Sequence, residues 1–523
     1  MSLLLNTKFL IRFTLFIICF LLLTLAFEGG NFWILGLVGL APFFVLIENS
    51  KNWKSVFLIS WVLGILIFMV SLRWMLAIFP NESLGLNSDT AGLFLIASAW
   101  FLFSLFSGLG FAIFGVFVKL LNVWSSRTCS LLTIPSAWII AEYLRAWIFS
   151  LAIWGEGALI GPFFTFNNMG YLLADTPFFY FARMGGLYGL SFLVVMTNAI
   201  IFLLLKKKYL LHAFAIIILI FLSSYFYVQN SESYSNDKLS INVLLLGIPP
   251  KTEPFYREGF LEILEGEHIA PENQPDIVVF PEGFPLLSIS GELENSVFSK
   301  LFPDQNKKGF VVANKMTFTE KGRISEIIYR DSKGNLIARQ EKSFLIPGGE
   351  TAPIVISAIA KVLGMDERIK IFRQNRQITK SAEPDYAVGL GDTRIGAFLC
   401  SGILAPDFSR RLVQQGAEIL INSASHNLWQ GHPRISNDLE LMARFEAMAH
   451  ERPILQATYG GPSFVIDEKG AIIKKSSLEK PEIFLAKVYP KDKKTLTARI
   501  GDLPIIIFAL LAIIISRMAK ARN

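Results

Sequence analysis

The chain is poor in charged residues and in cysteine. Charged residues make up 17% of its 523 residues and hydrophobic residues 53%, and both values lie outside the usual range of soluble globular proteins. The apolar residues are concentrated in residues 1–230 and in a final run from Leu503 to Ile515, whereas residues 236–500 have the composition of a soluble α/β domain. This distribution excludes a purely soluble protein, and the length predicts two or three domains.

Several common signatures of enzymes are also missing. There is no Gly-Lys dipeptide and hence no Walker A loop, no G-x-S-x-G turn and no H-E-x-x-H zinc motif. The five histidines show no ligand spacing, and only His426 lies near a strand end that could face a site. Nothing in the sequence calls for a metal or an organic cofactor. The net charge of +7 comes largely from lysine and arginine beside apolar segments, so it does not indicate nucleic acid.

Eight apolar segments have about the 20-residue length that a membrane-spanning helix needs. They cover residues 8–28, 31–48, 55–79, 91–118, 129–150, 185–205, 209–228 and 501–517. The last of them is the shortest. A cleaved signal peptide in place of the first span is disfavoured, because no small-residue cleavage site follows it. The sequence therefore predicts a bundle of about eight transmembrane helices.

Basic residues mark one side of this bundle. They lie before the first span, in every second loop and after the last span: Lys8, Arg12, Lys51, Lys54, Lys119, Arg127, Lys206, Lys207, Lys208, Arg517, Lys520 and Arg522. By the positive-inside rule, that side faces the cytoplasm. We therefore expect transmembrane helices in residues 1–230, a domain outside the cytoplasm in residues 236–498, and a last transmembrane helix in residues 501–518.

The cysteines are informative because there are only three. Cys19 and Cys129 belong to apolar segments, and Cys400 is the only cysteine of the outer domain. It has no partner for a disulfide. An unpaired thiol in an oxidising compartment is a liability unless it is buried or used.

The outer domain shows strands that alternate with helical patterns. Apolar strand-like runs cover residues 240–248, 276–284, 308–316, 392–400 and 417–425, and a hairpin covers 325–345. Residues 434–452 have apolar side chains at helical spacing, and a final pair of strands follows. Because the strands are almost continuously apolar, they predict a sheet covered on both faces.

Three of these strands end in a reactive side chain. Glu282 follows "DIVVFP", Lys342 follows the strand that ends "ARQE", and Cys400 follows "RIGAFL". Taken singly, each is more often an ordinary turn or strand-end residue. Together they meet a chemical need, because a thiol is a weak nucleophile until it loses its proton. A carboxylate can take that proton, and an ammonium can stabilise the thiolate and then an oxyanion.

The motifs around these residues resemble a known triad. "PEG" at Glu282, "EKSFLIPGGE" around Lys342 and "GAFLCSG" around Cys400 are similar to the Glu-Lys-Cys triad of the nitrilase superfamily. Four further segments resemble the bacterial apolipoprotein N-acyltransferase family: "EYLRAW" (142–147), "MGGLYGLSFLVVMTNA" (184–199), "LMARFEAMAHERPILQAT" (441–458) and "TLTARIGD" (495–502). The resemblance covers nearly the whole chain.

This resemblance implies an α-β-β-α sandwich and a ping-pong acyl transfer. Cys400 would be the nucleophile, Glu282 the general base and Lys342 the oxyanion stabiliser, with Glu350 as a second essential carboxylate. The implied partners are a phospholipid acyl donor, a diacylated apolipoprotein acceptor and the membrane itself. The resemblance also implies that the protein is a monomer in the bacterial inner membrane, with its nitrilase-like domain on the periplasmic side.

Lipid contacts are expected beside the triad. The candidates are Phe255, Tyr256, Arg145 and Trp429, where Phe255 or Tyr256 would replace a tryptophan that the family often has after the first strand. The apolar segment 352–365 reads either as an amphipathic arm on the lipid surface or as a helix packed in the core.

Two residues depart from the family pattern. Ser401 and Gly402 stand where the family usually has a tyrosine and a glutamate after the nucleophile. This departure puts the positioning of Lys342 and the choice of acceptor in doubt. It leaves open a membrane-tethered amidase or nitrilase-type hydrolase, an acyltransferase with another amine acceptor, and a scaffold with a relic triad.

Overall fold

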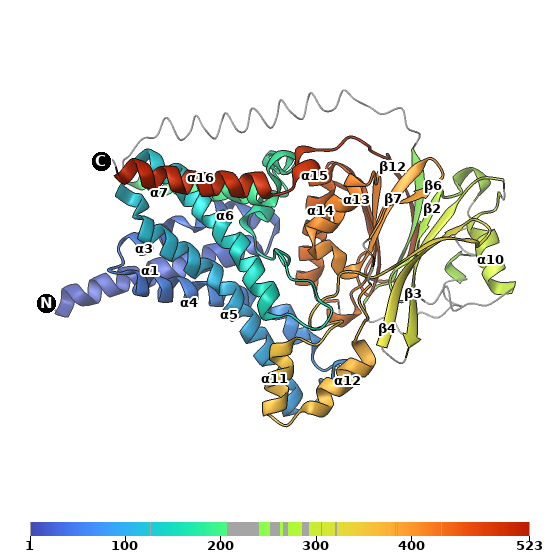
Figure 1. Ribbon diagram of the computed structural model, residues 1–523, viewed down its shortest axis with the longest axis horizontal. Helices are drawn as coiled ribbons and strands as arrows, with labels where there is room; N and C mark the ends of the chain where they lie inside the picture. Colours follow the sequence, from blue (N-terminus) through green and yellow to red (C-terminus); the bar gives the residue numbers. More distant parts are fainter. Residues whose placement is uncertain are drawn as a thin grey trace.

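The fold is described from a computed structural model of the chain. It covers residues 2–125, 127–206, 240–250, 262–264, 270–284, 292–304, 306–319, 322–381, 383, 385–429 and 431–521. Figure 1 shows a helical half at one end of the molecule and an α/β domain with two sheets at the other. The last helix, α16 (Leu503–Ala521), returns to the helical half and packs against α6 (Arg127–Ala152).

Five segments of the described chain are long and apolar enough to cross a membrane. They are Thr7–Phe27, Gly30–Glu48, Trp53–Ser71, Thr90–Leu121 and Pro177–Leu205. Their helices are α1 (Ser2–Phe27), α2 (Trp33–Gly39), α3 (Ala41–Glu48), α4 (Trp53–Ser71), α5 (Thr90–Leu121) and α7 (Ala182–Leu205). The predicted span 31–48 is broken between α2 and α3, where Pro42 lies in the first turn of α3 and supplies no backbone N–H.

The other three predicted spans have different outcomes. Residues 129–150 lie within α6, which carries Glu142 and Arg145 inside its apolar length. The span 209–228 lies outside the described residues. The span 501–517 corresponds to α16, whose apolar part, Leu503–Met518, is shorter than the others. Five N-terminal apolar segments are therefore established, and a count of eight crossing helices stays a prediction.

The α/β domain contains two six-stranded sheets. The first has the order β12-β1-β2-β3-β4-β5, and the second has the order β11-β10-β9-β8-β7-β6. The first sheet is built from β1 (Ile241–Gly247), β2 (Ile277–Val279), β3 (Phe310–Thr319), β4 (Gly322–Asp331), β5 (Leu336–Glu341) and β12 (Glu482–Val488). The second is built from β6 (Val388–Leu390), β7 (Thr393–Leu399), β8 (Ile419–Ser425), β9 (Ile454–Tyr459), β10 (Phe464–Ile466) and β11 (Ile472–Lys475). The strands and the hairpin predicted from the sequence are confirmed.

The two sheets pack face to face, with helices outside. Side chains such as Val279 and Val312 of the first sheet and Ile421 and Leu455 of the second share one buried core. Helix α10 (Glu292–Leu301) covers the outer face of the first sheet, and α13 (Pro406–Gln414) and α14 (Pro433–His450) cover the second (Figure 1). The layers therefore run helix, sheet, sheet, helix, and α14 confirms the helix predicted over 434–452.

Helix α14 also joins the domain to the helical half. Its buried apolar residues belong to the same core as those of the N-terminal helices. Near the junction, two further helices form a projecting arm, α11 (Ile354–Val362) and α12 (Asp366–Arg376) (Figure 1). Helix α11 buries Ile356 and Ala360 but leaves Ile354 and Val362 exposed, so the segment combines a packed face with an apolar exposed one.

Candidate active site

Glu282 and Cys400 lie where parallel strands end. β1, β2 and β3 run parallel in the first sheet, and β7, β8 and β9 run parallel in the second. Glu282 follows β2, and Cys400 directly follows β7. In parallel sheets, the carboxyl ends of the strands form the edge where ligands bind. The facing sheets bring two such edges together, so a carboxylate from one sheet and a thiol from the other meet in one pocket.

Lys342 links the two carboxylates of the site. Its Nζ lies 3.1 Å from Oε1 of Glu282 and also donates to Oε1 of Glu350. Lys342 is 4% exposed. Burial by itself lowers the pKa of Lys342, but Glu282 and Glu350 outweigh it and the net pKa lies above its ordinary value. The ammonium of Lys342 therefore stays charged.

Cys400 is held in an uncommon backbone conformation. Its φ is +42°, in the left-handed region that residues other than glycine rarely adopt. Its Sγ donates to the carbonyl of Ser425 at 3.5 Å. Burial and then the nearby Glu282 raise the pKa of the thiol, and Lys342 opposes them without cancelling the shift. The raised pKa favours the neutral thiol over the thiolate.

Glu350 is fixed by contacts on both of its oxygens. Oε1 faces Lys342, and Oε2 accepts from the backbone N–H of Ile346 at 3.0 Å. Ser401 Oγ lies 3.5 Å from Oε2 of Glu350 and donates to the carbonyl of Phe344 at 3.1 Å. Ser401, one of the two departures from the family pattern, therefore packs beside Glu350 and supports the carboxylate that holds Lys342.

Gly402 has no room for a side chain. A Cβ added there would lie 2.9 Å from Cδ2 of Phe398, a buried ring of β7. A glutamate at this position therefore does not fit the local packing. Ser401 and Gly402 therefore fit beside the site, and Glu282, Lys342 and Cys400 still lie together there.

The thiol faces a small pocket of about 140 Å³. The pocket is lined by both carboxylates, two arginines and several apolar or small residues: Glu282, Gly283, Met316, Arg323, Ile346, Gly349, Glu350, Arg376, Ile378, Cys400, Ser425, Asn427, Leu428 and Trp429. Asn314 supports its rim, because its Oδ1 accepts from the N–H of Gly283 at 3.1 Å. Trp429, predicted as a lipid contact, is part of the pocket wall.

A second, mainly apolar pocket adjoins the first. Ile346, Gly349, Leu428 and Trp429 line both of them. The second pocket continues toward the helical half, where its wall is formed by Trp74, Met75, Ile78, Leu95, Ile96, Ala99 and Phe103. Leu95 to Phe103 belong to α5, one of the membrane-length helices. An apolar space thus leads from that helix to the wall of the thiol pocket.

The remaining predicted lipid contacts fall elsewhere. Phe255 and Tyr256 lie outside the described residues. Arg145 is 4% exposed in α6, where its guanidinium donates to the carbonyl of Phe166 at 2.8 Å and to Oδ1 of Asn168. In the structure this side chain holds the loop that precedes α7.

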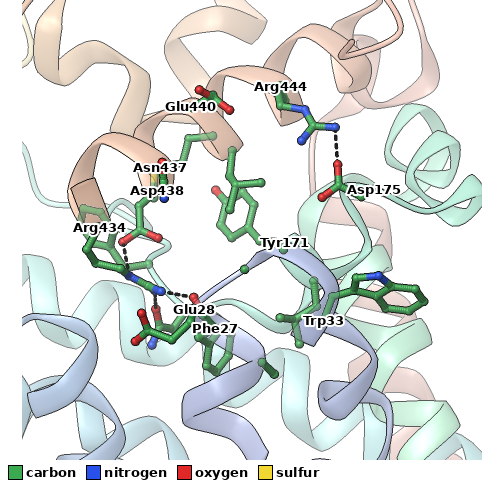
Figure 2. A pocket seen from close by; sticks show the side chains of 18 residues that line it. Phe27, Glu28, Trp33, Tyr171, Asp175, Arg434, Asn437, Asp438, Glu440 and Arg444 are labelled. Carbon is green, nitrogen blue, oxygen red and sulfur yellow. Dashed lines mark hydrogen bonds and ion pairs between the residues drawn. The ribbon is translucent and has the colours of Figure 1, made fainter. Parts of the chain in front are cut away.

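A separate polar pocket lies beside α14 and shares no lining residue with the thiol pocket. Figure 2 shows Arg434 and Arg444 of α14 facing the end of α1 and the loop around Asp175. Arg434 pairs with Asp438 at 3.1 Å and donates to the carbonyl of Phe27, and Arg444 pairs with Asp175 at 2.8 Å. Both arginines make these contacts where the α/β domain meets the helical half. We therefore assign this pocket to the attachment of the domain.

Sequence reasoning missed Arg323 and Arg376. Both line the thiol pocket, although 53 positions separate them and no motif marks either one. Arg323 is the second residue of β4, and its backbone forms hydrogen bonds with Gln377 and Thr379 just after α12. This long-range pairing brings the two arginines together.

Two family models match the chain. The apolipoprotein N-acyltransferase N-terminal domain matches residues 21–200, and the carbon-nitrogen hydrolase model matches residues 247–495. Both boundaries agree with the division between the helical half and the α/β domain. Together the two models account for most of the chain.

Individual relatives extend over the full length. The apolipoprotein N-acyltransferase of Haemophilus influenzae is 24% identical over 98% of this chain and 97% of its own. That of Wigglesworthia glossinidia brevipalpis is 22% identical over 95% and 96%. Among solved structures, a carbon-nitrogen hydrolase from Helicobacter pylori G27 matches with 16% identity and a TM-score of 0.35, covering 48% of this chain and 89% of its own.

Proposed function

Because the chain belongs to the apolipoprotein N-acyltransferase family, we propose that it moves an acyl chain from a phospholipid, through a thioester on Cys400, to the α-amino group of a diacylglyceryl-modified N-terminal cysteine. The observation that carries this proposal is the wall shared by the thiol pocket and the apolar pocket. A reaction on a soluble amide needs no apolar space beside the nucleophile, whereas an acyl chain does.

In the first half-reaction, Cys400 attacks the ester carbonyl of the phospholipid. Glu282 accepts the thiol proton, which the raised pKa of Cys400 would otherwise keep on sulfur. Lys342 stabilises the oxyanion of the tetrahedral intermediate. As the intermediate collapses, Glu282 returns the proton to the departing glycerol oxygen. The products are a thioester on Cys400 and a lysophospholipid.

In the second half-reaction, the amine of the acceptor attacks the thioester. Glu282 accepts a proton from the attacking nitrogen, and Lys342 again stabilises the oxyanion. The sulfur leaves and regains the proton from Glu282, so the enzyme returns to its starting state with an amide formed on the acceptor. Glu350 keeps Lys342 in place through both steps.

We further propose an inner-membrane location with the α/β domain on the periplasmic side. The support is the series of apolar helices, the bacterial sources of the relatives and the basic residues on one side of the predicted bundle. In this arrangement, about eight helices cross the membrane and the donor reaches the apolar pocket from the outer leaflet. The exposed apolar face of α11 would rest on the lipid surface.

The test is a labelling experiment on the purified full chain. The protein is incubated with phosphatidylethanolamine that carries a labelled acyl chain, and label on Cys400 is followed by mass spectrometry. A diacylated lipopeptide with a free N-terminal amine is then added. We expect a thioester that is stable alone and discharges onto the lipopeptide amine.

Two other results would contradict the proposal. Rapid discharge to water, with the lipopeptide unlabelled, would make the protein a hydrolase. Absence of label on Cys400 in a correctly folded preparation would make the triad a relic.

A further inference from the structure

Two arginines face the thiol pocket without a carboxylate partner. Among the described residues, no carboxylate lies within ion-pair distance of the guanidinium of Arg323 or of Arg376. Nε of each is buried and has no hydrogen-bond partner there. Arg323 donates through Nη1 to the backbone carbonyl of Asn375 and stacks over the ring of Phe318, and neither contact neutralises its charge.

The backbone brings the two cations together. Arg323 N–H donates to the carbonyl of Gln377 at 3.2 Å, and the N–H of Thr379 donates to the carbonyl of Arg323 at 2.8 Å. Arg376 directly precedes this pairing, at the last position of α12. Burial and then the neighbouring Arg376 lower the pKa of Arg323, and the more distant carboxylates Glu282 and Glu350 oppose this without cancelling it. A fold that keeps two like charges at one pocket wall gains from an anion placed between them.

The chemistry of the pair selects phosphate. Guanidinium groups present a planar fork of N–H donors that matches the oxygens of a phosphate. The proposed donor carries such a group a few bonds from the ester that Cys400 attacks, whereas the diacylglyceryl acceptor carries none. Resting on the proposed function, we propose that Arg323 and Arg376 bind the phosphodiester of the donor phospholipid and so position its ester carbonyl at Cys400.

This role separates the two half-reactions. Thioester formation uses the phosphate, so it depends on the pair. Discharge of the thioester to the amine takes place after the lysophospholipid has left, so it does not. A residue that only stabilised the fold or the oxyanion would affect both half-reactions.

The experiment measures single-turnover labelling of Cys400 from two donors with identical acyl chains, phosphatidylethanolamine and diacylglycerol. Arg323→Gln and Arg376→Gln should each slow labelling from phosphatidylethanolamine by about 10-fold, the usual loss for one charge-assisted hydrogen bond. Labelling from diacylglycerol should change by less than about 2-fold, because that donor makes no use of the pair. Discharge of preformed thioester to the lipopeptide should also be unchanged.

Arg339→Gln is the matched control. Arg339 lies on β5 of the same sheet with its side chain 71% exposed, and it does not line the pocket. Its loss should leave both donors unaffected. Arg376→Lys keeps the charge without the fork and should recover part of the rate.

Each contrary result has a defined meaning. Equal slowing with both donors, or no slowing with either, would overturn the assignment of the pair. Inhibition of the wild type by inorganic phosphate that the variants abolish, with donor rates unchanged, would assign the pair to a soluble anion and also overturn it. Failure of the wild type to take label from either donor would instead contradict the proposed function.

Discussion

The backbone N–H of Glu282 donates a hydrogen bond to the carbonyl of Ala424 at 3.2 Å. This bond ties the end of β2 in one sheet to the end of β8 in the other. The next carbonyl along β8, that of Ser425, accepts from Sγ of Cys400. One strand end therefore sets the position of both the predicted base and the predicted nucleophile, and the distance between them depends on how the two sheets pack.

The first prediction concerns the nucleophile. Cys400→Ala should abolish acyl labelling from phosphatidylethanolamine, because the proposed thioester forms on the sulfur of Cys400. Cys19→Ala and Cys129→Ala are the matched controls, since they remove thiols that the proposal assigns no role. Both should label like the wild type in the mass-spectrometric assay. Equal labelling of all three variants would refute the assignment.

The second prediction concerns the alkylation of the thiol. Since the pKa of Cys400 is raised, its thiolate fraction between pH 7 and 9 is below that of free cysteine. Iodoacetamide should therefore modify it slowly over that range, and faster as the pH rises. Glu282→Gln removes one cause of the raised pKa, so it should speed alkylation at a given pH while abolishing acyl transfer.

The control for that experiment is free cysteine measured at each pH. Slower alkylation of Glu282→Gln than of the wild type would mean that Glu282 promotes loss of the thiol proton even without substrate. In that case the electrostatic account of the resting thiol would be wrong.

The third prediction concerns the buried charges. Lys342→Met leaves Glu282 and Glu350 without their cation, and breaking a buried ion pair costs about 3–5 kcal/mol. We expect a large drop in the temperature of thermal unfolding. Adding Glu282→Gln and Glu350→Gln should restore most of the stability, because no uncompensated charge remains, yet acyl transfer should stay absent. An unchanged unfolding temperature in Lys342→Met would contradict the claim that Lys342 compensates the charges of the two buried carboxylates.

The fourth prediction concerns the residue after the nucleophile. Ser401→Ala loses the hydrogen bond to Phe344 and should lower the free energy of unfolding by about 1 kcal/mol. Acyl transfer should persist, since Ile346 still holds Oε2 of Glu350. Loss of all activity would give Ser401 a direct catalytic part. Gly402→Glu should destabilise the protein more, because its Cβ meets Phe398.

The fifth prediction concerns the apolar pocket. Ala99→Phe fills part of the space that we assign to the acyl chain, so it should shift donor preference toward shorter chains. Leu93→Phe, at an exposed position on the same helix, is the control. The readout is a competition between phospholipids of different chain length. Unchanged preference in both variants would place the acyl chain elsewhere.

The sequence by itself determined the division of the chain and the ends of its strands. Long apolar runs can be stable only in a membrane or a large core, and that signal is local. The apolar runs that stop at Glu282 and Cys400 are equally local signals, so these strands could be placed and their reactive ends noted without coordinates. The hairpin before Lys342 followed from its turn residues in the same way.

The tertiary structure decided which side chains meet. The contact between Ser401 and Glu350 depends on how the loop after β5 lies against the end of β7, and the approach of Arg323 to Arg376 depends on a pairing between β4 and the segment after α12. The apolar pocket arises only because α5 of the helical half faces the α/β domain. These are contacts between residues far apart in the chain, and local preference carries no information about them because long-range packing sets their register.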